Sequence, residues 1–301
     1  MFAMKAGCRV LVIACGLSLA APMAMGQRST AEVRESQQRY ESSAAGWRKS
    51  SLRSPRLSPA EIETLNDIRF IYERSPSPKA ASLRRFGERK VVISDGLMSL
   101  VEDLIRADAI TAAATPRQAA DRRDCFTAFG RLALGVARDN ARLATQDRRA
   151  RLRAVPRLSA FVDGRSADGC RGIEPAELVQ PAIEEAVAVA ADAALVWLLA
   201  RQAALHLLPA ANTGAATCAS EIADRAAVQH ATASGVDVLR AYPMVLAHAV
   251  LFGQAPPGAP SASCPLARER IAGFFQAAAP QAAGSDLPAL RSRALAAWPD
   301  Y

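Results

Sequence analysis

The sequence predicts a mainly α-helical protein with a small β element, an α+β fold stapled by disulfides. Apolar side chains recur every three or four residues through most of the chain, which is the spacing of helices with one buried face. Only one segment, residues 90–94, clearly combines several β-branched residues with a following Asp-Gly turn. Half of the residues are hydrophobic, so the chain is able to bury a substantial core.

Residues 1–26 have the pattern of a secretory signal peptide. Lys5 and Arg9 precede an apolar stretch that ends in small residues, and cleavage is expected before Gln27. We therefore predict a periplasmic or secreted protein. Alternatively, Cys15 is acylated as in a lipoprotein, although only five apolar residues directly precede it, fewer than the ~7–15 of a usual hydrophobic region.

Four of the six cysteines lie beyond this signal, an even number in an oxidising compartment. Of the three possible pairings we favour Cys125 with Cys170 and Cys218 with Cys264, because each pair closes a loop of similar, moderate length. A cysteine zinc site is the alternative, but no two of these cysteines are close enough in sequence to form a C-x-x-C motif.

The formal net charge is +8, and arginine supplies most of the positive charge. Five arginines lie between residues 148 and 157 without interleaved aromatic side chains. In an exported protein nucleic acid is not an expected partner, whereas an acidic protein face or the headgroups of an anionic membrane are within reach. The simpler interpretation of this arginine run is a solvated helix face.

Residues 27–57 are rich in Ser, Arg, Gln and Glu and are predicted to form a flexible or weakly helical leader. The folded domain, residues 58–301, opens with a capping box at Ser58-Pro59-Ala60-Glu61. The helix that follows is expected to stop near the prolines at 76 and 78. Its buried face would comprise Ile62, Leu65, Ile68 and Ile71.

A strand is predicted at residues 90–94, closed by a turn at Asp95-Gly96 and followed by a helix from Leu97 to Ile105. The composition from Thr115 to Val155 favours helix. A second short strand is expected at residues 158–162.

A long apolar helix is expected from Pro175 to Leu208, with a bend at Pro181. Asp192 and Arg201 interrupt it before the ~20 apolar residues that a membrane-spanning helix needs, so we predict a buried central helix. Further helices are expected near residues 218–234 and 237–251 and in a final pair that reaches residue 298, with a loop at 255–260.

Three segments, in this order, resemble motifs of one family. Residues 89–97 (R-K-V-V-I-S-D-G-L) match a strand and turn. Residues 199–208 (L-A-R-Q-A-A-L-H-L-L) match the zinc helix L-[AG]-H-E-x-x-H, and residues 218–225 (C-A-S-E-I-A-D-R) match a downstream E-x-E-A-D-R helix. The chain thus resembles the HtpX-type zinc metallopeptidases of the gluzincin clan, which implies a zincin-like core.

The resemblance also implies that the zinc chemistry is missing. Arg201 and Leu205 stand where the family has two histidine ligands, Gln202 replaces the general base, and Ser220 replaces the third ligand. Arginine cannot ligate a cation, glutamine cannot act as a base, and leucine has no donor atom. Asp224 keeps the place of an aspartate that supports a histidine ligand. We therefore expect no catalytic residue and no bound metal.

The other candidate residues give no competing site. His206, His230 and His248 lie on separate predicted helices and lack a ligand spacing such as H-x-x-x-H. Ser94 has no histidine near it in the sequence and does not match the nucleophile turn G-x-S-x-G. Nothing else in the sequence supports a hydrolase that pairs Ser94 with His206.

The sequence favours an exported, catalytically inactive metallopeptidase-like protein. It would act as a binding or scaffold protein for a polypeptide or an envelope protein, through the former substrate cleft and without a cofactor. Arg201 would pair with Asp224 inside a packed helix pair, or with a carboxylate of the partner.

Two alternatives remain open. The first is an active metalloendopeptidase with an atypical zinc site. The second is a helical envelope assembly factor unrelated to peptidases, and in that case the strand at 91–97 and the helix at Leu199 would not pack together.

Overall fold

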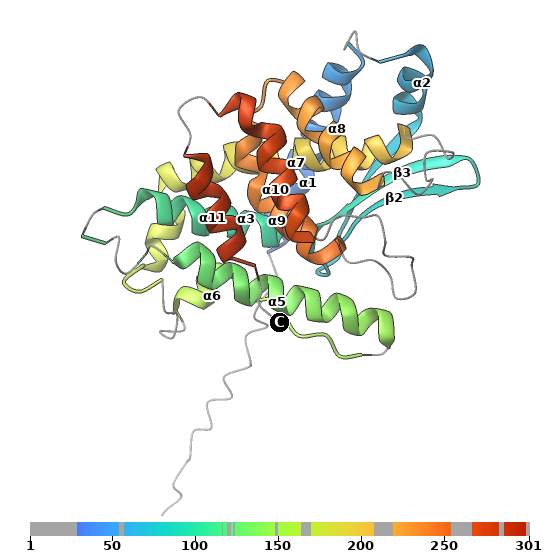
Figure 1. Cartoon of the computed structure of the whole chain (residues 1–301). Coiled ribbons are helices and arrows are strands. Elements are labelled where there is room, and N and C mark those ends of the chain that lie inside the picture. Colours follow the sequence, from blue (N-terminus) through green and yellow to red (C-terminus); the bar gives the residue numbers. More distant parts are fainter. Residues whose placement is uncertain are drawn as a thin grey trace, which may run out of the picture.

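The computed structural model describes residues 29–53, 57–115, 117–118, 122, 124–147, 150–163, 170–207, 219–253, 267–282 and 286–298. These residues form packed helices with one three-stranded sheet at their side (Figure 1), so the predicted mainly helical α+β class is confirmed. The helices are α1 (Thr30–Ser51), α2 (Pro59–Asp67), α3 (Asp95–Ala113), α5 (Cys125–Gln146), α6 (Leu158–Asp163), α7 (Pro181–Leu207), α8 (Ala219–Ala233), α9 (Tyr242–Phe252), α10 (Ala267–Ala278) and α11 (Leu287–Ala296). The strands are β1 (Ile68–Glu73), β2 (Ala80–Arg85) and β3 (Glu88–Ser94), and short 3-10 helices are η1 (Pro175–Val179), η3 (Val238–Ala241) and η4 (Ala279–Gln281).

The sheet has the strand order β1-β3-β2. The central strand β3 pairs in parallel with β1 and antiparallel with β2, which it follows through a tight hairpin turn. Val91 and Ile93 of β3 are fully buried, and α1 and α7 both contact the sheet. The predicted strand is therefore present, and it is the buried centre of a larger sheet.

Helix α7 is the centre of the core. It begins directly after η1, where the sequence predicts a bend at Pro181, and it contacts α1, α3, α8 and α9. Trp197 and its neighbours on all sides of the helix are buried, as expected for a central helix. No helix of the described residues is long and apolar enough to cross a bilayer.

A packed helix occupies most of the segment that the sequence predicts as a flexible or weakly helical leader. Helix α1 starts with a capping box at Ser29 and buries Tyr40 and Trp47. The Tyr40 ring lies 5.5 Å from Tyr72, and the Trp47 ring lies 5.9 Å from Phe70. Of the two alternatives the helical one is present, and two aromatic side chains attach this otherwise polar helix to β1.

The helix predicted to extend from Ser58 to the prolines ends at Asp67 instead. Its capping box is present and Leu65 is buried, but Ile68 and Ile71 belong to β1. The sequence I-R-F-I-Y-E of β1 is β-branched and aromatic, and pairing with β3 satisfies its backbone, so tertiary context overrides the helical spacing.

Two further expectations are corrected. Residues 158–162 form part of the short helix α6 rather than a strand. Residues 150–157 form neither helix nor strand, although their composition favours helix. The helical prediction for this part of the chain is correct over α5, which buries Phe126, Phe129 and Leu134 while Leu132 stays 44% exposed.

Gly96 lies in the first turn of α3 rather than in a loop between strand and helix. Ser94 is the N-cap, and its Oγ accepts a hydrogen bond from the backbone N–H of Leu97 at 3.3 Å. A Cβ on Gly96 would lie only 2.1 Å from the carbonyl oxygen of Pro76. Glycine is needed here because the segment after β1 passes directly over the start of α3.

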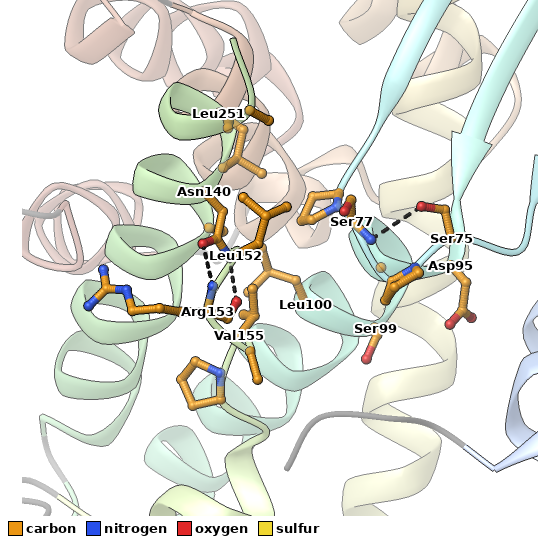
Figure 2. A pocket seen from close by; sticks show the side chains of 18 of the residues that line it. Ser75, Ser77, Asp95, Ser99, Leu100, Asn140, Leu152, Arg153, Val155 and Leu251 are labelled. Atoms are coloured by element: carbon orange, nitrogen blue, oxygen red, sulfur yellow. Dashed lines mark hydrogen bonds between the residues drawn. The ribbon is translucent and has the colours of Figure 1, made fainter. Parts of the chain in front are cut away.

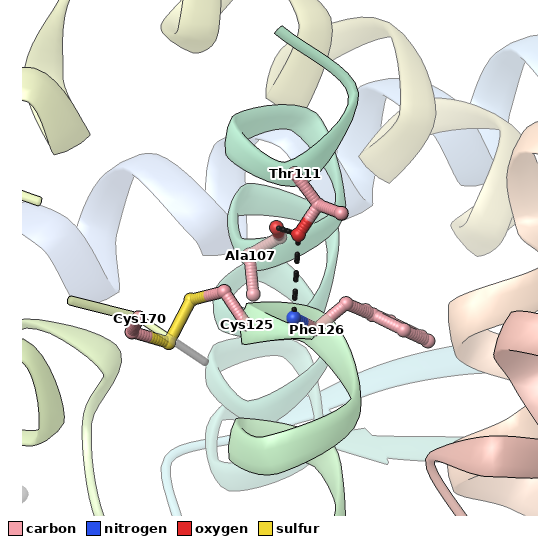
Figure 3. Close-up of a disulfide and its surroundings, with 5 residues drawn as sticks. All are labelled: Ala107, Thr111, Cys125, Phe126 and Cys170. Atoms are coloured by element: carbon pink, nitrogen blue, oxygen red, sulfur yellow. Dashed lines mark hydrogen bonds between the residues drawn. A yellow bond between two sulfur atoms is a disulfide. The ribbon is translucent and has the colours of Figure 1, made fainter. Parts of the chain in front are cut away.

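The predicted disulfide between Cys125 and Cys170 is present, with the two Cα atoms 4.5 Å apart (Figure 3). It joins the first residue of α5 to the segment before η1. Beside it, the backbone N–H of Phe126 donates to Thr111 Oγ1 of α3 at 3.3 Å.

The helices near the C-terminal end of the chain agree with prediction. The segment near 218–234 contains α8, the segment near 237–251 contains η3 and α9, and the final pair consists of α10 and α11. Four predicted features fall outside the described residues: the signal peptide with Cys15, Leu208, the disulfide between Cys218 and Cys264, and the loop at 255–260.

Candidate functional site

The positions matched to the zinc motif lie on two helices that pack against each other. Arg201, Gln202 and Leu205 are on α7, and Ser220 and Asp224 are on α8. Arg201 and Gln202 are buried, whereas Leu205 and Ser220 are partly exposed. The Nε of Arg201 donates to Oδ1 of Asp224 at 2.6 Å, so the predicted ion pair between the helices is present.

A third helix adds a second guanidinium to the same carboxylate. Arg270 of α10 donates from Nε to Oδ2 of Asp224 at 2.7 Å and from Nη2 to Oδ1 at 3.0 Å. One of these arginines precedes Asp224 in the sequence and the other follows it, and both bind its carboxylate. Charge-assisted bonds of this kind are among the strongest hydrogen bonds in proteins. We call Arg201, Asp224 and Arg270 the arginine cluster.

His248 of α9 links the arginine cluster to the sheet. Its Nδ1 lies 3.2 Å from Arg270 Nη2 and its Nε2 lies 3.4 Å from the side-chain amide of Gln202. Ser82 of β2 contacts both the side-chain amide oxygen and the backbone carbonyl of Gln202 at 2.7 Å. Arginine only donates hydrogen bonds, so Nδ1 of His248 accepts and the ring proton sits on Nε2. This proton is satisfied when the amide of Gln202 is turned over, so that its oxygen faces the ring and its nitrogen faces Ser82.

The arginine cluster carries excess positive charge, which keeps His248 neutral. Two guanidiniums against one carboxylate leave one excess positive charge, and each arginine side chain is only 4% exposed. Burial, together with the charges of Arg201 and Arg270, lowers the pKa of His248 well below its usual range. Burial also lowers the pKa of Arg201, although Asp224 opposes this shift. A cation would be repelled from such a site.

The remaining histidines and Ser94 make structural contacts. His206 places Nε2 3.1 Å from the carbonyl oxygen of Lys90, and burial lowers its pKa. Ser94 donates to the carbonyl oxygen of Ser77 at 2.8 Å and is fully buried. Ser94 and His206 are not hydrogen-bonded to each other within the described structure. Among the residues that the structure describes, no three His, Cys, Asp or Glu side chains form a group that could hold a metal ion.

A cleft of about 1090 Å³ lies elsewhere on the protein, and none of the zinc-motif positions lines it. Its walls come from the segment after β1, the first turns of α3, the second half of α5 and the end of α9 (Figure 2). Residues 151–157, which form neither helix nor strand, run along it. Both apolar and polar side chains line the cleft, as in most ligand sites.

Asn140 of α5 holds this extended segment by its main chain. Its Nδ2 donates to the carbonyl oxygen of Arg153 at 2.6 Å, and its Oδ1 accepts the N–H of Arg153 at 2.9 Å (Figure 2). Asn140 is 7% exposed, so the two bonds are largely shielded from water. An amide that pairs with both groups of one residue recognises an extended backbone without reading its side chain.

Asp103 of α3 fixes the other end of the segment. It accepts hydrogen bonds from Arg157 Nε at 2.6 Å and from the backbone N–H of Leu158 at 3.2 Å. Arg153 pairs with Asp139 at 2.7 Å. Two arginines of the run are therefore internal ion-pair partners, and the expectation of a solvated helix face is wrong for residues 150–157, which are not helical.

The sequence reasoning missed Arg270 and Asn140. Arg270 stands four residues before Phe274 and next to Ile271, both buried, so its place on the apolar stripe of α10 was a usable signal. No sequence pattern identifies Asn140, because its partner is the backbone of Arg153, which tertiary contacts bring beside it.

The sequence matches no protein-family model, no curated protein and no solved structure. Function therefore has to be inferred from the side chains of the arginine cluster and of the cleft.

Proposed function

We propose that this chain is an exported, catalytically inactive relative of the HtpX-type zinc metallopeptidases that serves as a binding or scaffold protein for another polypeptide. The observation that carries this proposal is the arginine cluster. Where the resemblance assigns a histidine ligand and its supporting aspartate, Arg201 and Asp224 form a buried ion pair. A fixed guanidinium supplies positive charge that neither activates water nor polarises a carbonyl through an open coordination position.

The packing of the motif segments supports the ancestry. Helix α7 contacts both β3 and α8, so the three segments that carry the resemblance are neighbours in space. Val91 and Leu199 belong to one hydrophobic cluster. The alternative of an unrelated helical assembly factor would be favoured if the strand and the Leu199 helix did not pack together, and this packing does not favour it.

The cleft supports a polypeptide as the ligand. Asn140 already holds an extended backbone there, and the cleft continues past this segment to Ser75, Ser99 and Leu251 (Figure 2). In this proposal the binding surface is this cleft rather than the surroundings of Gln202, where Ser82 and His248 leave no free polar group on the glutamine side chain.

The first test is the zinc content of the mature, untagged chain, measured by mass spectrometry after purification without chelators. We expect folded protein with far less than one zinc per chain. Near-stoichiometric zinc, or chelator-sensitive cleavage of an unfolded substrate, would overturn the proposal in favour of an active peptidase.

The ancestry has its own test, in which the zinc motif is rebuilt. The variant combines Arg201→His, Gln202→Glu, Leu205→His and Ser220→Glu, with Arg270→Met to remove the second guanidinium. We expect it to take up zinc, because two histidines one turn apart and a glutamate on the facing helix form a catalytic-type site. The matched control keeps Leu205 and should bind much more weakly. A folded variant that stays free of zinc would contradict the relationship.

The polypeptide ligand is tested by blocking the cleft. The probe is a fluorescently labelled, reduced and alkylated unfolded protein, and its binding is followed by anisotropy. Ala144→Trp fills the cleft from α5, whereas Leu132→Trp places the same side chain on an exposed part of α5 outside it. We expect the first variant to bind at least about tenfold more weakly and the second to bind like the parent chain. Equal binding by both variants would rule out this cleft.

A further inference from the structure

The β2–β3 hairpin ends in an exposed apolar tip. Phe86, at the turn, is 95% exposed and Leu83 is 44% exposed. The hairpin extends away from the helices at one side of the molecule (Figure 1). A single exposed apolar side chain is common on protein surfaces, but Phe86 lies at the turn of the hairpin together with the exposed Leu83, so the two form a small apolar tip.

The backbone at this tip strains the phenylalanine. Phe86 has φ 49° and Gly87 has φ 82°, so both turn residues are in the left-handed region, as in a type I′ turn. Such turns favour Asn-Gly, and Phe86 is the only described residue other than glycine with positive φ. The turn therefore contains an aromatic residue at a position where asparagine would be more stable, which points to a role for the side chain itself.

Basic residues surround the apolar tip. Residues 83–90 read L-R-R-F-G-E-R-K and contain four cations against one carboxylate. Lys90 is paired with Glu88 and Arg89 with Asp67, so the cation that lies beside the exposed ring is Arg85. The guanidinium of Arg85 lies 5.5 Å from the centre of the Phe86 ring. Ser82 and Arg84 contact α7, so the alternating residues Leu83 and Arg85 lie on the opposite side of the strand.

We propose that this tip docks on an anionic lipid bilayer. The ring of Phe86 and the side chain of Leu83 would enter the boundary between headgroups and acyl chains, while Arg85 binds a lipid phosphate. Aromatic and basic residues together are typical of interfacial membrane anchors.

The shape of the tip favours a membrane over a protein partner. A stable protein interface buries about 800 Å² on each side and needs a ring of ordered contacts around its centre. A convex turn of a few residues offers much less, whereas a bilayer adapts to any convex apolar point. The contact with lipid is accordingly weak and sensitive to salt, since electrostatic attraction supplies much of it.

Sedimentation of the mature chain with vesicles tests this inference. Vesicles of phosphatidylglycerol and phosphatidylethanolamine are compared with vesicles of phosphatidylcholine alone. We expect binding to the anionic vesicles only, reduced by added salt. Replacing Phe86 by asparagine should weaken binding at least about tenfold, and Arg85→Ala about fivefold.

Phe86→Asn also controls for folding, because asparagine fits the left-handed turn. Its thermal midpoint should equal or exceed that of the parent chain. The matched control is Val179→Asn, which removes another exposed apolar side chain, 65% exposed in η1, and should leave vesicle binding unchanged.

Three outcomes would overturn the proposal: no binding to anionic vesicles, equal binding to neutral ones, or unchanged binding by Phe86→Asn. The first, in a chain that binds an acidic protein through Phe86, would identify a protein partner instead. None of these measurements depends on zinc or on the cleft, so the proposed function stands or falls separately.

Discussion

Removal of the Asp224 carboxylate should destabilise the protein more than removal of either arginine. The carboxylate accepts one hydrogen bond from Arg201 and two from Arg270. Asp224→Ala leaves two guanidiniums buried side by side without a counter-charge. Arg201→Ala leaves Asp224 with both bonds from Arg270, so its charge remains compensated.

The structure sets the expected size of the two effects. Breaking a buried ion pair from one side costs about 3–5 kcal/mol, and both arginine side chains are only 4% exposed, so Asp224→Ala belongs in this range. For Arg201→Ala we expect the loss of one charge-assisted hydrogen bond, about 1.5–3 kcal/mol. Arg240, whose ion pair with Asp237 is half exposed, serves as the control, and Arg240→Ala should cost less than about 1 kcal/mol.

Equilibrium unfolding in urea measures these differences. Trp197 is a suitable fluorescence probe, because it is fully buried on α7 and its ring lies 5.9 Å from His248. The reasoning fails if Asp224→Ala costs less than Arg201→Ala, or if both costs are as small as that of the exposed control. A triple variant that combines Arg201→Met, Asp224→Leu and Arg270→Met should recover most of the lost unfolding free energy, because apolar side chains of similar size remove all buried charges together.

Three further predictions concern other parts of the fold. Cys125→Ser should lower the free energy of unfolding by about 4 kcal/mol, because the bond to Cys170 closes a loop with a sequence separation of 45, and chemical denaturation with and without reductant checks this value. Gly96→Ala should cost about 3 kcal/mol or more in the same assay, because its Cβ would meet the backbone of Pro76 and not a movable side chain; an unchanged midpoint would contradict the described packing. The pKa of His248 is lowered in the folded protein, so the unfolded chain binds a proton that the folded chain does not. Stability should therefore decline as the pH falls below about 6.5, by up to about 1.4 kcal/mol per pH unit. His248→Gln should flatten this decline in thermal unfolding between pH 7 and 5.

The sequence alone predicted the elements whose pattern is local. The capping box at Ser58 and the buried helix around Trp197 follow from spacing along one helix. The pairing of Arg201 with Asp224 was expected from the family resemblance, with a carboxylate of a partner as the alternative. The disulfide between Cys125 and Cys170 followed from loop length. In these cases the residues that make the sequence pattern are the same residues that make the structural contact.

The features that the sequence did not reveal depend on distant partners. β2 reads A-A-S-L-R-R, which has no β-branched residue, and it is a strand only because β3 pairs with it. Ile68 and Ile71 satisfy helical spacing and strand composition equally, so only the parallel partner decides between them. One wall of the cleft is the segment 151–157, which Asn140 and Asp103 hold by contacts with Arg153 and Arg157 although its composition favours helix.

Arg270 has a consequence for biosynthesis. A chain made from its N-terminus presents Arg201 and Asp224 well before Arg270, and α10 is the second-last α-helix of the described chain. Until α10 is synthesised, α8 is held to the core by one guanidinium instead of two. The arginine cluster is thus completed late in synthesis, and a chain that terminates before residue 270 would leave α8 with half of its charged anchor and expose it to the quality control of its compartment.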